Sequence, residues 1–507
     1  MLARVFSCTT IGMEPCLVEV EVDVGPGLPC LEIVGLPDTT VKESKERVRT
    51  AIKNSGFEFP PRRMIINLAP ADIRKEGPGF DLAIAVGILA ATEQVKVHHL
   101  ENFVLAGELS LDGRIRPVPG ILVMSAFLVD KAGYSFIIPA DNAEEARLTQ
   151  TDTYALSHLL EVRELLEQPE RFTPLEKVGL SEILEENITG EYDLMEVKGQ
   201  KMAKRALEVA AAGGHNILLV GSPGSGKSLL ARCLASILPP LTPEEAFESS
   251  KIHSVSGLLS RERPLVTTRP FRSPHHSASS ASIIGGGTVP RPGEMTLATH
   301  GILFLDELPE YRRDVLESMR QPLEDKEVTL ARAAAVITYP ARFQLVAAAN
   351  PCYCGYYGDP LKECSCTPYQ VTKYRNKISG PLLDRIDLHV EVPRVSFKEL
   401  ESPEQEESSQ SVRSRVVQAR ALQTVRFNGT GTTCNAQMSV REIRKYCVLQ
   451  ERARELLGQA FKALNLSARA HHRILKVART IADLDESAEV RSEHVAEAIQ
   501  YRSFDRS

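Results

Sequence analysis

Apolar and polar residues alternate near the start of the chain, and further along the apolar residues gather into short runs. The alternation from Cys16 to Val24 predicts a half-buried strand. Further strands are expected at Met64–Leu68 and Phe103–Gly107, and helices at Lys42–Lys53 and Asp81–Ala91. This mixture of helices and strands predicts an α+β domain over residues 1–166.

Helices alternate with short buried strands in the middle of the chain. The apolar runs expected to form strands are Ile217–Val220, Ile302–Leu305 and Leu345–Ala349, and helices are expected at Lys201–Ala212 and Ser228–Leu238. Strands that alternate with helices are typical of a parallel sheet covered on both faces. We therefore expect an α/β core over residues 192–395.

The last segment, 412–507, is rich in Ala, Leu, Arg and Glu and contains no proline, which predicts a helical bundle. Two polar stretches separate the three segments. Residues 167–191 mix Pro, Glu and Thr, and residues 396–411 include the acidic, Ser-rich run Glu399–Ser411. Both stretches are expected to be linkers.

The composition is that of an ordinary globular protein, with 507 residues, 43% hydrophobic and 25% charged. That length is too great for one core. The longest apolar run, Leu82–Ala91, is too short to cross a bilayer, and no secretory signal is evident, so we expect a cytoplasmic protein without a membrane partner. A formal net charge of -6 argues against a broadly basic surface but leaves room for a local basic site.

One stretch fits the phosphate-binding loop pattern, because it follows an apolar strand and opens a predicted helix. Its residues are Gly221, Ser222, Pro223, Gly224, Ser225, Gly226, Lys227 and Ser228. The glycines allow backbone N–H groups to surround phosphate oxygens, while Lys227 is expected to reach the β- and γ-phosphates of ATP and Ser228 to bind Mg²⁺.

Polar residues follow the next two predicted strands. Asp306 emerges at the end of Ile302–Leu305, where it is expected to act on the Mg²⁺ side, and Glu307 is expected to polarise the attacking water. Asn350 ends the third strand and is expected to orient water and the γ-phosphate. The alternatives are two solvated acids and an asparagine that caps a turn, but their pairing with the phosphate loop favours ATP hydrolysis.

Four cysteines form two short hooks within fifteen residues: Cys352, Cys354, Cys364 and Cys366. Four thiolates suit a tetrahedral Zn²⁺, which would be structural because no coordination position stays open. The alternative is four reduced thiols in a loop.

Several stretches are more specific still. They include Val197–Gln200, Lys204–Glu208 and Ala210–Asn216 before the phosphate loop, and then Phe271–His276, Gly355–Gly358, Ser379–Asp387 and Ala498–Arg502. Together they resemble the magnesium-chelatase-like AAA+ ATPases, and among these the bacterial ComM/YifB group. The resemblance covers the whole chain and implies a central AAA+ core and a C-terminal helical lid.

The resemblance also implies a function and further site residues. ComM is associated with DNA branch migration during natural transformation, and the motors of this family assemble as rings, for which we expect a hexamer. Arg385 resembles the arginine finger that reaches the γ-phosphate of a neighbouring subunit, and Arg469 resembles the second sensor on the lid. Without the resemblance, each would be taken for an ordinary surface arginine.

The N-terminal domain resembles the proteolytic domain of Lon-type proteases, a ribosomal S5-like fold, most clearly over Gly107–Gly120. The expected catalytic pair is missing, because Gly79 stands in place of the nucleophilic serine and Ser125 in place of the lysine. The fold is therefore expected without the protease activity.

DNA contacts are expected at a β-hairpin predicted over Glu327–Tyr339, since related ring motors turn such a hairpin toward their central channel. Arg332 lies near its tip and Lys326 at its base; the alternative is solvated charge. The absence of Trp and an aromatic content of 6% favour contacts with phosphates over base stacking. A chelatase motor subunit and an ATP-dependent scaffold for protein partners are the rival functions.

Overall fold

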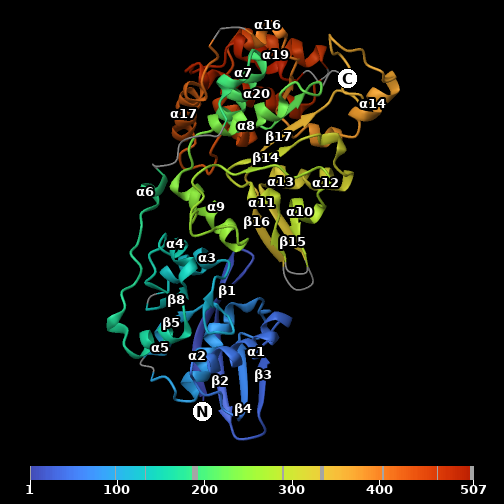
Figure 1. The fold of residues 1–507 in the computed structure, drawn as a ribbon. Helices are drawn as coiled ribbons and strands as arrows, with labels where there is room; N and C mark the ends of the chain where they lie inside the picture. Colours follow the sequence, from blue (N-terminus) through green and yellow to red (C-terminus); the bar gives the residue numbers. More distant parts are fainter. Residues whose placement is uncertain are drawn as a thin grey trace. The chain divides into compact units, whose positions relative to one another are not determined.

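The chain folds into two compact units, each built from stretches that are distant in sequence. The computed structural model in Figure 1 describes residues 2–96, 99–131, 133–184, 192–287, 290–331, 336–401, 405–464 and 466–502. Unit 1 contains Met1–Asn187, Thr242–Thr267 and Thr329–Tyr339, and unit 2 contains Ile188–Leu241, Thr268–Val328 and Pro340–Ser507. The stretch 192–395, predicted as one domain, thus contributes two segments to the unit that holds the N-terminal residues.

Unit 1 is built on a mixed sheet with the strand order β3-β4-β2-β1-β5-β8-β9. The β1–β2 and β2–β4 pairs are antiparallel and the other neighbours are parallel. The predicted alternation is present in β2, where Val18, Val20, Val22 and Val24 are buried. The strands are β1 (Leu2–Ile11), β2 (Glu14–Gly25), β3 (Cys30–Val34), β4 (Arg63–Ala69), β5 (Phe103–Leu105), β8 (Ser135–Pro139) and β9 (Thr153–Leu156), with a separate pair β6 (Glu108–Leu109) and β7 (Ile115–Arg116).

Unit 1 contains seven α-helices among its described residues, of which α2 and α3 pack on strands of this sheet. They are α1 (Thr39–Asn54), α2 (Asp81–Ala91), α3 (Ile121–Val129), α4 (Ala143–Ala146), α5 (Leu159–Glu167), α6 (Leu180–Leu184) and α9 (Pro243–Val255). Almost every residue of α2 is buried, because the helix packs on β1, β2 and α1. Its uniform apolarity follows from contact on all sides.

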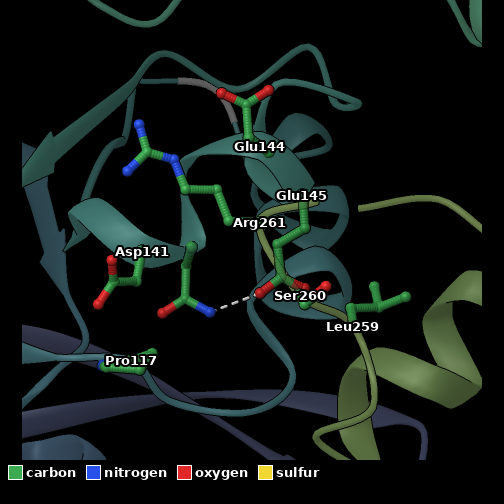
Figure 2. A pocket seen from close by; sticks show the side chains of 8 residues that line it. Pro117, Asp141, Glu144, Glu145, Leu259, Ser260 and Arg261 are labelled. Atoms are coloured by element: carbon green, nitrogen blue, oxygen red, sulfur yellow. Dashed lines mark hydrogen bonds between the residues drawn. The ribbon is translucent and has the colours of Figure 1, made fainter. Parts of the chain in front are cut away.

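Buried hydrogen bonds join α9 to the N-terminal residues of unit 1. The carboxylate of Glu145 accepts hydrogen bonds from Asn142 Nδ2 at 2.6 Å, Ser254 Oγ at 2.6 Å and the N–H of Leu122 at 3.2 Å. Ser254 O also accepts from the N–H of Gly120 at 3.0 Å. Glu145 lines a cleft of about 270 Å³, and Figure 2 shows it among other residues that line this cleft. Burial raises the pKa of Glu145, and the hydrogen bonds from Ser254 and Asn142 oppose that shift.

The predicted hairpin is present and also belongs to unit 1 for most of its length. It consists of β15 (Glu327–Ala331) and β16 (Val336–Pro340). Ile337 and Tyr339 are buried and pack on the turn between β1 and β2, where a side chain at Gly12 would come within 2.3 Å of Ile337 Cγ2. Arg332, the residue predicted to touch DNA from the tip, lies outside the described residues.

Unit 2 is centred on a sheet with the order β11-β14-β17-β10-β18, in which all neighbouring strands are parallel. The strands are β10 (Ile217–Val220), β11 (Phe271–Arg272), β14 (Ile302–Leu305), β17 (Gln344–Ala349) and β18 (Leu388–Glu391), with a short separate pair β12 (Gly285–Gly286) and β13 (Arg291–Pro292). The core helices are α7 (Lys201–Gly213), α8 (Lys227–Ile237), α10 (Ser280–Ile284), α11 (Glu294–Leu297), α12 (Arg313–Ser318), α13 (Arg320–Asp325), α14 (Pro368–Arg375), α15 (Gly380–Leu383) and α16 (Phe397–Leu400). The predicted α/β architecture with a parallel sheet is confirmed.

The C-terminal region of unit 2 is helical, as predicted. Its helices are α17 (Ser409–Arg426), α18 (Val440–Tyr446), α19 (Glu451–Ala463), α20 (Ala468–Leu484) and α21 (Ser492–Gln500). Helices α17 and α20 pack on α7, and one apolar cluster continues from the sheet into these helices. The buried ring of His215 lies 2.8 Å from Thr480 Oγ1 and 3.2 Å from Asp387 Oδ2, which joins the helical region to the core through polar contacts as well.

The acidic stretch expected to be a linker is held against unit 2. Glu406 accepts a hydrogen bond from the N–H of Gly199 at 2.8 Å and pairs with Lys204 at 2.7 Å, while Glu407 pairs with Arg415 at 2.5 Å. Lys204, which is far away in the sequence, and Arg415 of the following helix neutralise these charges. Among the described residues, no helix combines the length and apolarity needed to cross a membrane.

Glu145→Ala should loosen α9 from unit 1, because Ser254 Oγ, Asn142 Nδ2 and the Leu122 N–H would lose a buried acceptor. A lost partner of this kind costs about 1–3 kcal/mol. Amide hydrogen exchange should show protection falling in α9 and at the start of α3. Glu144→Ala is the matched control, since Glu144 forms a partly exposed pair with Arg147. Equal protection in the two variants would contradict the assigned role of Glu145.

Candidate nucleotide-binding site

The loop from Gly221 to Ser228 joins β10 to α8, so the first N–H groups of the helix point toward the loop. Gly224 and Gly226 have φ angles of 77° and 87°, in the left-handed region that favours glycine. The expected order of strand, loop and helix is present. This arrangement can bind a phosphate through backbone N–H groups and the positive end of the helix dipole.

Lys227 is held across this loop. Its ammonium donates to Gly221 O at 2.8 Å, to Ser222 O at 3.0 Å and to Asn350 Oδ1 at 3.3 Å. Burial lowers the pKa of Lys227, and the charges of Asp306 and Glu307 act in the opposite direction. Because an ammonium has three donors, a bound phosphate must replace at least one of these acceptors.

Neighbouring strands place the predicted polar residues beside the loop. Strands β14, β17 and β10 are adjacent and parallel, so Asp306, Asn350 and the phosphate loop leave the sheet at the same edge. Ser228 Oγ donates to Asp306 Oδ2 at 2.8 Å. A hydroxyl and a carboxylate in contact here provide the oxygen ligands that Mg²⁺ prefers.

Glu307 follows Asp306 in an unusual backbone conformation, with φ at 52°. A non-glycine residue in this region carries strain, and such residues concentrate at functional sites. Its N–H donates to Asp306 Oδ1 at 2.9 Å, and its half-exposed carboxylate lies 3.4 Å from His276 Nδ1. In the sequence, only the place of His276 in the Phe271–His276 stretch marked it.

Gln200 is a second residue at the site that the sequence reasoning did not single out. Its Nε2 donates to Ser225 O at 2.6 Å and to Pro393 O at 3.2 Å, so it supports the loop from outside. It has φ at 51° and immediately precedes α7. The signal was its place in the Val197–Gln200 stretch.

The two predicted arginines lie apart from the contacts described so far. Arg385 donates to Pro381 O at 2.6 Å and pairs with Glu324 at 2.7 Å. Arg469 is exposed in the first turn of α20. One turn later, Arg473 lies 3.1 Å from Asp387.

Lys326, expected at the base of a DNA-binding hairpin, ends α13 as its C-cap, and only part of the residue is exposed. Burial lowers its pKa, and the charge of Asp387 raises it. The side chain therefore lies within the electrostatic reach of the Asp387–Arg473 pair.

The four predicted cysteines converge. The Sγ atoms of Cys352, Cys354 and Cys364 are 3.4–3.6 Å apart, and Cys366 brings the set to four sulfurs that all lie within 4.8 Å of one another. A zinc ion bonded to four sulfurs at about 2.3 Å places them about 3.8 Å apart. Burial opposes ionisation of Cys354, but hydrogen bonds from the Tyr356 backbone and Cys352 lower its pKa to about 5. The residues present fit a tetrahedral Zn²⁺.

The two positions at which the protease pair is missing, Gly79 and Ser125, both lie in unit 1. Ser125 is buried in α3, where its Oγ lies 2.6 Å from Thr149 Oγ1. Gly79 lies in the turn before α2, and a Cβ there would meet Val118 at 3.9 Å. Ser125 therefore packs as a buried core residue and Gly79 as part of a turn, and neither position offers the side chain that the protease reaction needs.

Three family descriptions of magnesium chelatase match successive parts of the chain. Residues 20–142 match subunit ChlI of Mg-chelatase, residues 193–400 match magnesium chelatase subunit ChlI, and residues 406–502 match its C-terminal region. The YifB protein of Salmonella typhimurium is 45% identical over 100% of this chain and 98% of its own length. The competence protein ComM of Haemophilus influenzae is 44% identical over 99% of this chain and 98% of its own length.

The chain belongs to the ComM/YifB family of magnesium-chelatase-like proteins. The family is of the AAA+ type and implies an ATPase that uses ATP and Mg²⁺. A more distant, local similarity links 29% of the chain to the DNA replication licensing factor mcm-5 of Caenorhabditis elegans, at 28% identity over 145 residues and 16% of that protein.

Lys227→Ala should weaken the binding of ATP by about a hundredfold or more, because each hydrogen bond to a charged group contributes about 1.5–3 kcal/mol. Titration with a fluorescent ATP analogue measures the loss. Lys462→Ala, which removes an exposed lysine from α19, is the control and should bind as the unaltered protein does. Equal affinities for the two variants would remove Lys227 from the site.

Proposed function

We propose that this protein is a ring-forming, DNA-stimulated motor in which ATP hydrolysis by a hexamer drives branch migration of DNA during recombination.

 The ATPase part of this proposal is carried by the contact between Ser228 Oγ and Asp306 Oδ2 at 2.8 Å, beside the ammonium of Lys227. A hydroxyl, a carboxylate and an ammonium so arranged are the parts that phosphoryl transfer requires. A cytoplasmic location is part of the same proposal.

Each residue of the site has a task in this mechanism. Lys227 gives up its hydrogen bond to Asn350 and donates instead to the β- and γ-phosphate oxygens. Ser228 and Asp306 would hold Mg²⁺, which would neutralise negative charge on the phosphates. Glu307 orients and polarises the attacking water, and the release of Asn350 from Lys227 leaves its side chain available to the γ-phosphate and the water.

The ring is supported by what the chain's own arginines contact. Arg385 pairs with Glu324, outside the set of residues that surround Lys227 in the same chain. A guanidinium in that position suits a site shared with a neighbouring subunit, where it would stabilise the charge on the γ-phosphate. Arg469, exposed at the start of α20, is kept as the second sensor.

The DNA part is supported by the relatives. One full-length relative is named a competence protein and a local one a DNA replication licensing factor. Arg332 and Lys326, predicted from the sequence for the tip and the base of the hairpin, remain the proposed contacts with DNA phosphates. Such contacts release counterions and make the affinity depend on salt more than on base sequence.

A chelatase motor subunit is the second candidate, because the three matching family descriptions all name that enzyme. The full-length relatives favour the DNA motor. They match across 98% of their own length, and they are named YifB and competence protein ComM rather than as chelatase subunits. The two candidates differ in their expected response to DNA, because DNA should stimulate ATP turnover only in the DNA motor.

ATP turnover measured with and without a four-way DNA junction tests the proposed function. The unaltered protein should hydrolyse ATP faster with the junction. Glu307→Gln should bind ATP but hydrolyse it about a hundredfold more slowly in either condition, because the general base is lost. Glu310→Gln, which removes an exposed charge that pairs with Lys377, is the matched control. If the unaltered protein hydrolysed ATP at the same rate with and without the junction, the DNA motor would be rejected.

Arg385→Ala should leave ATP binding within a few-fold of normal and reduce turnover on the order of 10³-fold. Mixing this variant with Lys227→Ala should restore part of the turnover, because each variant keeps a different half of a shared site. Arg454→Ala, which removes a surface arginine paired with Glu451, is the control. Full turnover by Arg385→Ala alone would rule out the finger.

A further inference from the structure

The loop that carries the four cysteines begins immediately beyond the phosphate site. Strand β17 ends at Ala349, Asn350 accepts a hydrogen bond from Lys227, and Cys352 follows after one proline. The loop then turns back, because the N–H of Gly355 donates to Cys352 O at 3.0 Å. The first pair of cysteines is therefore tied directly to a residue that touches the phosphate-site lysine.

Gly355 packs against the phosphate loop itself. A Cβ at this position would lie 2.7 Å from both Cγ and Cδ of Pro223, which is closer than carbon atoms approach in folded proteins. Its φ of 83° also favours glycine. The backbone of the cysteine loop thus lies directly on the proline of the phosphate loop, with no space for a side chain between them.

Polar contacts also join the cysteine loop to the phosphate loop, through Asp359, which lies between the two pairs of cysteines. The Asp359 carboxyl is shielded from solvent, and a hydrogen bond from the Ser222 side chain, together with the N–H of Leu361, lowers its pKa. Arg394 Nε lies 3.0 Å from Asp359 Oδ2, and another nitrogen of the same guanidinium donates to Pro223 O at 3.4 Å. Asp359 and Arg394 therefore hold the cysteine loop to both Ser222 and Pro223.

Ring contacts, rather than a helix or strand, accompany the sulfur cluster in the cysteine loop: Tyr353 packs edge-on against Tyr374, and Lys362 lies over Tyr356. Residues 352–366 contain no helix or strand among the described elements, and Leu361 in the loop is exposed. Four sulfurs within 4.8 Å of one another are what closes it. A metal bound to those sulfurs would contribute folding free energy to a segment of this kind.

We propose that residues 352–366 form a zinc-binding clamp on the phosphate loop, so that occupancy of the four thiolates by Zn²⁺ sets the affinity for ATP. Zinc fixes the positions of Gly355 and Asp359, and these residues fix Pro223 and Ser222. When zinc is lost, the clamp opens and the phosphate loop loses its support on one side. The proposal rests on the proposed binding of ATP at Lys227.

Zinc content and ATP affinity, measured on the same full-length protein, test the clamp. Freshly purified, reduced protein should contain about one zinc per chain by mass spectrometry of the metal. Removing zinc with a chelator in the presence of excess Mg²⁺ should weaken ATP binding about tenfold, and added Zn²⁺ should restore it. Cys364→Ser should lose both zinc and ATP affinity, whereas Cys30→Ser, which alters an exposed cysteine of unit 1, should lose neither.

A pair of glycine variants separates the clamp from the metal. Gly355→Ala and Gly358→Ala place a methyl group at similar φ angles of 83° and 78°, but only the first meets Pro223, since a Cβ at Gly358 meets nothing within 4 Å. Gly355→Ala should keep its zinc and bind ATP about tenfold more weakly, since overpacking of this kind strains the contact. Gly358→Ala should keep both.

Three results would overturn the proposal. They are reduced protein without zinc, ATP affinity that does not change when zinc is removed, and equal ATP affinity in the two glycine variants. Failure of the zinc-loaded, unaltered protein to bind ATP would instead reject the proposed function and the clamp with it.

Discussion

Neighbouring strands of a parallel sheet end on the same edge, and the phosphate site of this chain depends on that constraint. Because β17 lies between β14 and β10, the residues that follow these three strands meet without any further device. Asp306 then contacts Ser228, and Asn350 contacts Lys227. The hydrophobic strands thus determine the arrangement of the polar groups, although they take no part in the chemistry.

The hydrogen bonds of Lys227 explain how the loop keeps its shape before phosphate binds. A buried ammonium without partners would be costly, and here the loop's own carbonyl oxygens accept its hydrogen bonds. The longest of the three bonds is the one to Asn350, at 3.3 Å. Phosphate can replace that acceptor with the least loss, and Asn350 then changes partner when nucleotide binds.

Much of the fold and of the phosphate site could be predicted because the signals are local. The loop pattern, the apolar strands and the acids that follow them are short stretches whose chemistry does not depend on distant residues. Four residues of the site could not be predicted from the sequence: Gln200, His276, Asp359 and Arg394. Their roles come from contacts with residues far away in sequence, and no spacing reveals these contacts. The contact of the acidic stretch with Lys204 could not be predicted for the same reason, since Lys204 lies far before it in the sequence.

The N-terminal residues share unit 1 with two insertions of the central region, and this limits how the chain can be shortened. A chain that began at Tyr192 would keep α9 and the hairpin but lose the residues that cover them. Ser254 would lose the carboxylate that accepts its hydrogen bond, and Ile337 and Tyr339 would be left without the turn at Gly12. Such a fragment would expose apolar surface and tend to aggregate. The N-terminal segment and these two insertions therefore depend on one another for their stability.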